Sequence, residues 1–177
     1  MLSIAEAEEL VAQHLGDAPR ANHSRVVAHV MRKLAEALSE PVELWEVVGL
    51  CHDLDFFAIQ GDWSRHGPMA VEWLGDRIPL EAQQAIAAHD HRTGIVADSR
   101  LADSLKAADA ITVIDEKLGR PALRAIDTAS PYAELRTKLG RRSYLADMAE
   151  HYAQKHELPF ERLVETIVEA PTQPLPA

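Results

Sequence analysis

The sequence predicts an all-α protein, and three observations support this. Its composition is rich in Ala, Leu and Glu, which favour helices, and only 5% of the residues are aromatic. Apolar residues recur at helical spacing along most of the chain. A length of 177 residues suits one domain. We expect a single helical domain over residues 1–168 and a disordered tail over 169–177, because three prolines and no periodicity occur near the end.

The first two predicted helices are well marked. Ser3 followed by Glu6 forms a capping box, and the helix that it opens runs to Gly16. A second amphipathic pattern then continues to Leu38, with His23 in its first turns. His23 is therefore expected near a helix N-terminus.

A third helix is expected to begin near Pro41 and to reach His52 and Asp53 at its C-terminal end. The apolar pattern breaks over 54–63, which indicates a loop. A short helix holding His66 should follow. His52 and Asp53 are thus expected at the C-terminal end of one helix, and His66 is expected on the next helix.

Two more helices carry polar residues of interest. Pro79 is expected to open a helix that ends around His89, and Ser99 should cap a long helix that reaches Leu118 and contains Asp109. The rest of the domain, up to residue 168, predicts two or three further helices that serve as packing surface. We identify no chemistry in that last part of the sequence.

Charge and cysteine content narrow the function classes. The formal net charge of −10 disfavours binding to nucleic acid polymers and to anionic membranes. Small-molecule substrates and metal cations remain as partners. The single cysteine, Cys51, cannot form an internal disulfide, and no signal peptide or membrane-spanning stretch is evident. We expect a cytoplasmic location; nothing in the sequence predicts the oligomeric state.

A set of histidines and aspartates recurs in a recognisable order along these helices. Its members are His23, His52, Asp53, His66, His89 and Asp109. Imidazole and carboxylate groups suit divalent transition metals, and a carboxylate can bridge two ions. We therefore expect one or two divalent ions at the centre of the bundle, with Asp53 as the bridge. Iron or manganese is the first choice, with nickel or zinc as alternatives.

His91 is a second histidine close to His89, and one of the two must be chosen. The two residues are only two positions apart, so on a continuous helix they would face different sides. We choose His89 as the ligand.

Several motifs resemble those of the HD-domain superfamily of metal-dependent phosphohydrolases. The similarity covers roughly residues 20 to 115 and includes Asn22-His23-Ser24, Gly49-Leu50-Cys51-His52-Asp53-Leu54-Asp55, Arg65-His66-Gly67 and Lys106-Ala107-Ala108-Asp109-Ala110. The resemblance implies a helical bundle in which the first histidine, the His-Asp pair and the last aspartate hold one metal. Two intervening histidines imply the dinuclear branch, which includes phosphatases, phosphodiesterases and diiron oxygenases.

One position departs from the family pattern. Many hydrolytic members carry His-Asp-Ile-Gly-Lys, whereas Phe56 stands here in place of the lysine. A cationic side chain that assists catalysis must therefore come from another position. Lys106, one turn before Asp109, is the first candidate, and Arg65 and Arg92 are others.

Asp55 has two open interpretations. It is either an acceptor that orients a ligand histidine or a solvated acid in a loop.

Three functions fit these motifs. The first is a metal-dependent phosphohydrolase, a phosphatase or phosphodiesterase, for a small phosphorylated metabolite or nucleotide. Its predicted catalytic residues are Asp53, which would orient the nucleophile, and Lys106, which would contact the substrate phosphate. The alternative is a diiron oxygenase acting on a phosphonate or polyol. The third is a module that binds metal or nucleotide without turnover.

Overall fold

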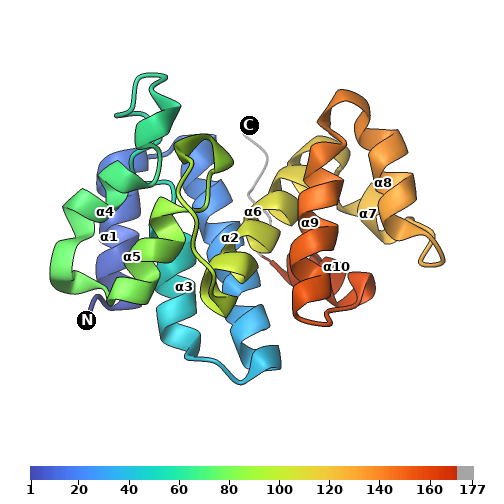
Figure 1. The fold of residues 1–177 in the computed structure, drawn as a ribbon, viewed down its shortest axis with the longest axis horizontal. Helices are drawn as coiled ribbons and strands as arrows, with labels where there is room; N and C mark the ends of the chain where they lie inside the picture. The colour runs from blue at the N-terminus through green and yellow to red at the C-terminus, as the bar shows by residue number, and fades with distance from the viewer. Residues whose placement is uncertain (171–177) are drawn as a thin grey trace.

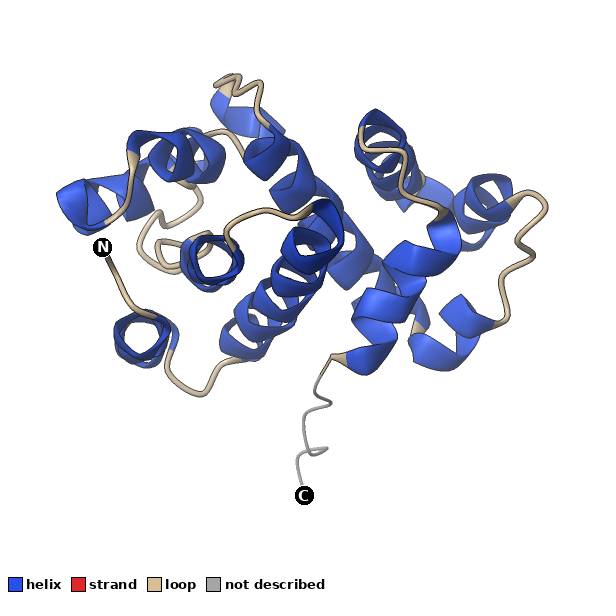
Figure 2. Cartoon of the chain, turned by 90° about the horizontal axis from the view of Figure 1, so that it is seen from below, coloured by secondary structure: helices blue, strands red, loops and turns tan. Residues whose placement is uncertain are grey.

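The computed structural model describes residues 1–170, and that part of the chain folds into helices without any strand (Figure 2). The all-α prediction is confirmed. Both predicted caps are present, because the Ser3 side chain accepts from the Glu6 backbone and the Ser99 side chain accepts from the Ala102 backbone. Of the predicted tail, residues 171–177 lie outside the described residues.

Six α-helices and three short 3₁₀ turns make up the part of the chain that carries the motifs. They are α1 (Ile4–Leu15), α2 (Pro19–Leu38), α3 (Val42–Cys51), η1 (Trp63–Arg65), α4 (Pro68–Leu74), η2 (Gly75–Arg77), α5 (Leu80–Ala87), η3 (His91–Thr93) and α6 (Arg100–Leu118).

The C-terminal part has more helices than the two or three expected. They are α7 (Arg120–Arg124), α8 (Pro131–Leu139), η4 (Gly140–Arg142), α9 (Tyr144–Lys155) and α10 (Phe160–Glu169). Helix α10 also includes the first residue of the predicted tail, since it ends at Glu169 and the following Ala170 is buried. No helix in the described part of the chain is long and apolar enough to cross a bilayer.

Helix α6 stands between the two parts of the molecule, with α1 to α5 on one side and α7 to α9 on the other (Figure 1). It packs against α2 and α5 on the first side and against α9 on the second. Helix α10 packs back onto α2, and one cluster of buried apolar side chains includes residues from both parts. The two parts therefore share a core around α6.

Helices α2 and α3 approach each other closely because α3 carries a glycine at the crossing. A Cβ atom added at Gly49 would lie 2.5 Å from Cα of Ala28. Larger residues cannot fit there without moving the helices apart. The glycine thus holds the C-terminal end of α3, where His52 and Asp53 follow, against α2.

The structure corrects the predicted positions of two histidines. His66 was expected within a helix, but it precedes α4 in an extended conformation, and His89 lies two residues beyond the end of α5. Helix α4 does not extend back to His66, because Pro68 disfavours a helical conformation for the residue directly before it. That residue, Gly67, has a φ of +93°, and a Cβ atom there would lie 2.4 Å from the carbonyl oxygen of Ile86.

Candidate metal centre

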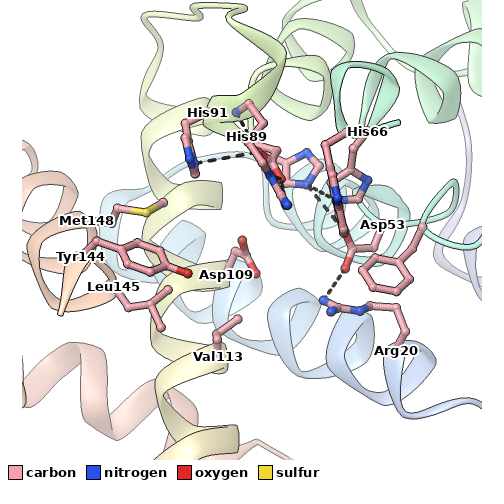
Figure 3. A pocket seen from close by; sticks show the side chains of 14 residues that line it. Arg20, Asp53, His66, His89, His91, Asp109, Val113, Tyr144, Leu145 and Met148 are labelled. Carbon is pink, nitrogen blue, oxygen red and sulfur yellow. Dashed lines mark hydrogen bonds and ion pairs between the residues drawn. The ribbon is translucent and has the colours of Figure 1, made fainter. Parts of the chain in front are cut away.

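Asp53 lies at the centre of the predicted ligand set, surrounded by four imidazole rings, of which Figure 3 shows those of His66 and His89. Its Oδ1 is 3.1 Å from Nε2 of His66 and 3.6 Å from Nε2 of His89. Its Oδ2 is 3.4 Å from Nε2 of His52 and 3.7 Å from Nε2 of His23. Burial alone would raise the pKa of Asp53, but these rings outweigh it and hold the pKa well below its usual range. Asp53 is therefore a carboxylate at neutral pH.

The sixth predicted residue, Asp109 on α6, joins the group through His23. Its Oδ1 lies 3.0 Å from Nε2 of His23, and the other ring nitrogen of His23 is 2.8 Å from Oε1 of Glu116. Burial disfavours protonation of His23, yet the two carboxylates raise its pKa to about 9. The pKa of Asp109 is about 2, because the neighbouring imidazole outweighs the effect of burial. The structure thus brings all six predicted residues together.

Each of the four histidines is oriented by an acceptor at Nδ1. The acceptors are the Glu116 carboxylate for His23, the Gly49 carbonyl for His52, the Asp55 carboxylate for His66 and the Ile86 carbonyl for His89, at 2.7 to 2.8 Å. Because Nδ1–H donates to these groups, the neutral ring presents a lone pair on Nε2. Acceptors placed behind a histidine in this way fix its tautomer for metal binding.

The Nε2 atoms of the four rings all face the interior of the cluster, toward one another and toward the carboxylates of Asp53 and Asp109. Nε2 of His66 and Nε2 of His89 are 3.2 Å apart, and Nε2 of His52 is buried without a hydrogen-bond partner among the described residues. Two sets of donor atoms, His23–His52–Asp109 and His52–Asp53–His89, each lie within 4.8 Å of one another. Metal ligands at roughly 2.0–2.2 Å from an ion are separated by about 3 to 4 Å. The donor set therefore fits a divalent metal.

Asp55 is the buried acceptor rather than a solvated loop acid. Its Oδ1 accepts from His66 Nδ1, while its Oδ2 accepts from the backbone N–H groups of Gly67 at 2.6 Å and Ala70 at 3.1 Å. It is completely buried. One carboxylate thus orients His66 and also satisfies the N-terminus of α4. Although burial opposes it, the carboxylates of Asp53 and Asp55 raise the pKa of His66 to about 9.

A cavity of about 240 Å³ opens above the cluster. Asp53, His66, His89 and Asp109 line it on one side, and α9 supplies part of the opposite wall (Figure 3). The wall residues from α9 are Tyr144, Leu145 and Met148. No sequence pattern indicated this role, because these residues belong to a region in which we identified no chemistry.

Two arginines that line the cavity are each held on an aromatic ring. The guanidinium carbon of Arg20 lies 4.1 Å from the centre of the Phe56 ring, and Nη1 donates to Oδ2 of Asp53 at 2.9 Å. Arg92 lies 3.6 Å from the centre of the Trp63 ring and pairs with Asp90 through three hydrogen bonds from its guanidinium. Arg92 was a candidate from the sequence, but Arg20 was not, since an arginine in a first helical turn is unremarkable without the fold.

The other two predicted cations lie elsewhere. Lys106 does not line this cavity; its side chain lies over the ring of Tyr152, with Nζ 5.3 Å from the ring centre. Arg65 is exposed and pairs with Glu72 at 3.8 Å. A catalytic role for Lys106 stays a prediction.

The comparison with known families agrees with this geometry. A profile of the HD domain matches residues 20–114, more than half of the chain. The chain belongs to the HD-domain family. That family includes metal-dependent phosphohydrolases, and all six predicted ligands fall within the match. The match ends inside α6, so the cavity wall from α9 lies outside the HD domain. No curated protein and no solved structure matches the chain.

Proposed function

We propose that this HD-domain protein is a metal-dependent phosphohydrolase for a small phosphorylated metabolite or nucleotide. The observation that carries the proposal is the convergence of four Nε2 atoms and two carboxylates, part of which lines a cavity that Arg20 also lines. One or two divalent ions, iron or manganese before nickel or zinc, would be held by His23, His52, Asp53, His66, His89 and Asp109. When bound, they would supply Lewis-acid activation of water and neutralise charge on the phosphoryl group.

The side chains around the cluster have separate tasks. Asp53 and Asp109 remain ionised at neutral pH, since their pKa values are lowered, so they keep their ligand oxygens available. Arg20 uses one hydrogen bond to hold Asp53, and a guanidinium has five N–H donors. Its remaining donors would bind a phosphoryl oxygen and orient the ester. Arg20 thus brings a cation to the ring of Phe56, the residue that stands in place of the family lysine.

The first test combines metal content with a generic substrate. Protein purified without a metal-affinity tag is analysed for metals and assayed on p-nitrophenyl phosphate with added manganese, nickel, zinc or ferrous iron. We expect metal-dependent hydrolysis that Asp53→Ala abolishes together with metal binding. The exposed acid Asp76 serves as a control, and Asp76→Ala should change neither quantity. Hydrolysis that persists in Asp53→Ala would contradict the assignment of the site.

The second candidate is a diiron oxygenase acting on a phosphonate or polyol, which the absence of the motif lysine at Phe56 favours. Two irons per chain without hydrolysis of any ester would support it, and oxygen consumption with a phosphonate or polyol would then be measured. Bound metal with neither activity would indicate a module that binds without turnover.

A further inference from the structure

A second cavity adjoins the one above the candidate metal centre. Its volume is about 330 Å³. Both cavities are lined by His89, His91, Tyr144 and Met148. Because they share these walls, a molecule with one end at the ligand cluster can extend into the second cavity. The second cavity lies over α6 and α9, partly outside the matched HD domain.

The surface of the second cavity is suited to a flat organic group. Tyr144, Met148 and Tyr152 contribute two aromatic rings and a thioether. Tyr144 is 50% exposed, so its ring is not needed to fill the core. Aromatic rings at a cavity mouth provide large apolar contact area at small entropic cost.

Lys106 gives this cavity an anion-binding group. Its half-buried side chain lines the cavity, and among the described residues it forms no ion pair or hydrogen bond beyond its contact with the Tyr152 ring. Lys155 lies over the same ring at 5.8 Å, but its Nζ also pairs with Asp103 at 3.1 Å. Of the two lysines, Lys106 is therefore the one whose ammonium group is not paired with a carboxylate among the described residues.

We propose that the second cavity binds the organic part of the substrate and that Lys106 binds an anionic group on it. The substrate would then be a phosphate ester whose leaving group carries a second anionic group, such as a carboxylate. An apolar or aromatic portion would lie between the phosphate and that group. This inference rests on the proposed hydrolase function for the first end of the molecule. It gives Lys106 a binding role instead of the catalytic role expected from the sequence.

The test uses two esters whose leaving phenols have closely similar acidity. They are 4-(carboxymethyl)phenyl phosphate and 4-methylphenyl phosphate, which differ in the carboxylate. We expect kcat/KM to be about tenfold higher for the carboxylated ester, the size of a charge-assisted contact that is partly exposed. In Lys106→Met, which keeps the length of the side chain, the ratio of the kcat/KM values for the two esters should fall to about one. Lys117→Met is the control, since Lys117 is exposed on the same helix and lines neither cavity.

A binding measurement separates failure of this inference from failure of the proposed function. Calorimetry compares 4-hydroxyphenylacetate with 4-methylphenol on the wild-type protein and on Lys106→Met. Selective binding of the acid, lost in the variant, would support the second site even if neither ester is cleaved. Equal preference in wild type and variant, or no binding of the acid, would overturn it whatever the catalytic result.

Discussion

The matched HD region and the C-terminal helices differ in what they bury. The HD region buries ionisable side chains, including His52, Asp53 and Asp55, none more than 2% exposed. Beyond residue 120, the described part of the chain has no buried carboxylate, and its buried polar groups are few: Thr166, whose hydroxyl donates to its own helix, and single side-chain atoms of Tyr132 and His156. The ion pairs there lie near the surface, as between Arg136 and Asp147.

Under the proposed function, this difference would separate the residues that hold the ion from the residues that contact the substrate. Buried charges cost free energy unless each is paired, so the HD region depends on its whole network of partners. The C-terminal helices depend on apolar packing and lend one wall to the cavity. Changes in the first region should therefore affect metal and fold together, whereas changes in the wall should affect substrate alone.

The largest effect is expected from Gly67→Ala in the HD region. The residue has a φ of +93°, and the new Cβ would lie 2.4 Å from the Ile86 carbonyl oxygen. Strain and clash together should lower the free energy of unfolding by about 3 kcal/mol or more. Because Gly67 separates His66 from α4, metal content should fall as well. Urea denaturation and elemental analysis measure both effects.

Gly61→Ala is the matched control for that substitution. Gly61 has a nearly equal φ of +90°, but a Cβ there would meet nothing within 4 Å. It should cost only the backbone strain, about 1 kcal/mol. Equal losses in the two variants would show that the contact with Ile86 is unimportant.

Asp55→Asn should have the next largest effect. The amide keeps one acceptor but places N–H donors opposite the ring of His66 or the backbone of Gly67 and Ala70. We expect metal affinity, measured by competition with a chelator, to fall by about 10- to 100-fold. Asp62→Asn is the control, since Asp62 caps η1 at the exposed surface. A loss of the same size in the control would refute the orienting role of Asp55.

The gathering of the six residues into one cluster could be predicted from the sequence, because the order of residue types along the chain is itself the family pattern. The helix caps at Ser3 and Ser99 could also be predicted, since a cap is an interaction between residues close together in the sequence. The exact settings of His66 and His89 could not, because they lie just beyond helix ends. Those ends depend on contacts between Gly67 and a separate helix.

Most of the surroundings of these six residues could not be predicted, although Asp55 and Arg92 were among the candidates. Arg20 meets Asp53 across 33 positions, and Glu116 meets His23 across 93. Such pairs form only once α2, α3 and α6 have packed, and no local periodicity encodes them. The same holds for the wall supplied by Tyr144, which depends on how α9 packs on α6.

A smaller effect concerns pH. Each of His23 and His66 has a pKa raised to about 9 by carboxylates, and a metal must displace that proton. Metal binding at pH 7.5 should therefore release one to two protons per chain, and affinity should rise about tenfold or more from pH 7 to pH 8. Calorimetry in buffers of different ionisation enthalpy counts the protons. Binding without proton release would contradict these assignments.

The same two histidines also set the stability of the protein after chelation. Their pKa in the folded protein lies above the usual value of about 6.5. Their contribution to the free energy of unfolding is therefore fully present below pH 6.5. It should be lost as the pH rises through about 9. Urea midpoints between pH 6 and pH 9.5 would follow this loss, and constant midpoints would contradict it.

The smallest effect is expected from Tyr144→Ala in the cavity wall. The ring is half-exposed and Tyr144 is not one of the six predicted ligands, so stability should change by less than about 0.5 kcal/mol and metal content should stay the same. KM for an aryl phosphate should rise about threefold, because part of the apolar contact is lost. His151→Ala, also on α9 but lining neither cavity, should leave KM unchanged. Loss of metal from Tyr144→Ala would show that the two regions are not separable, since a wall that only receives substrate has no means of releasing the ion.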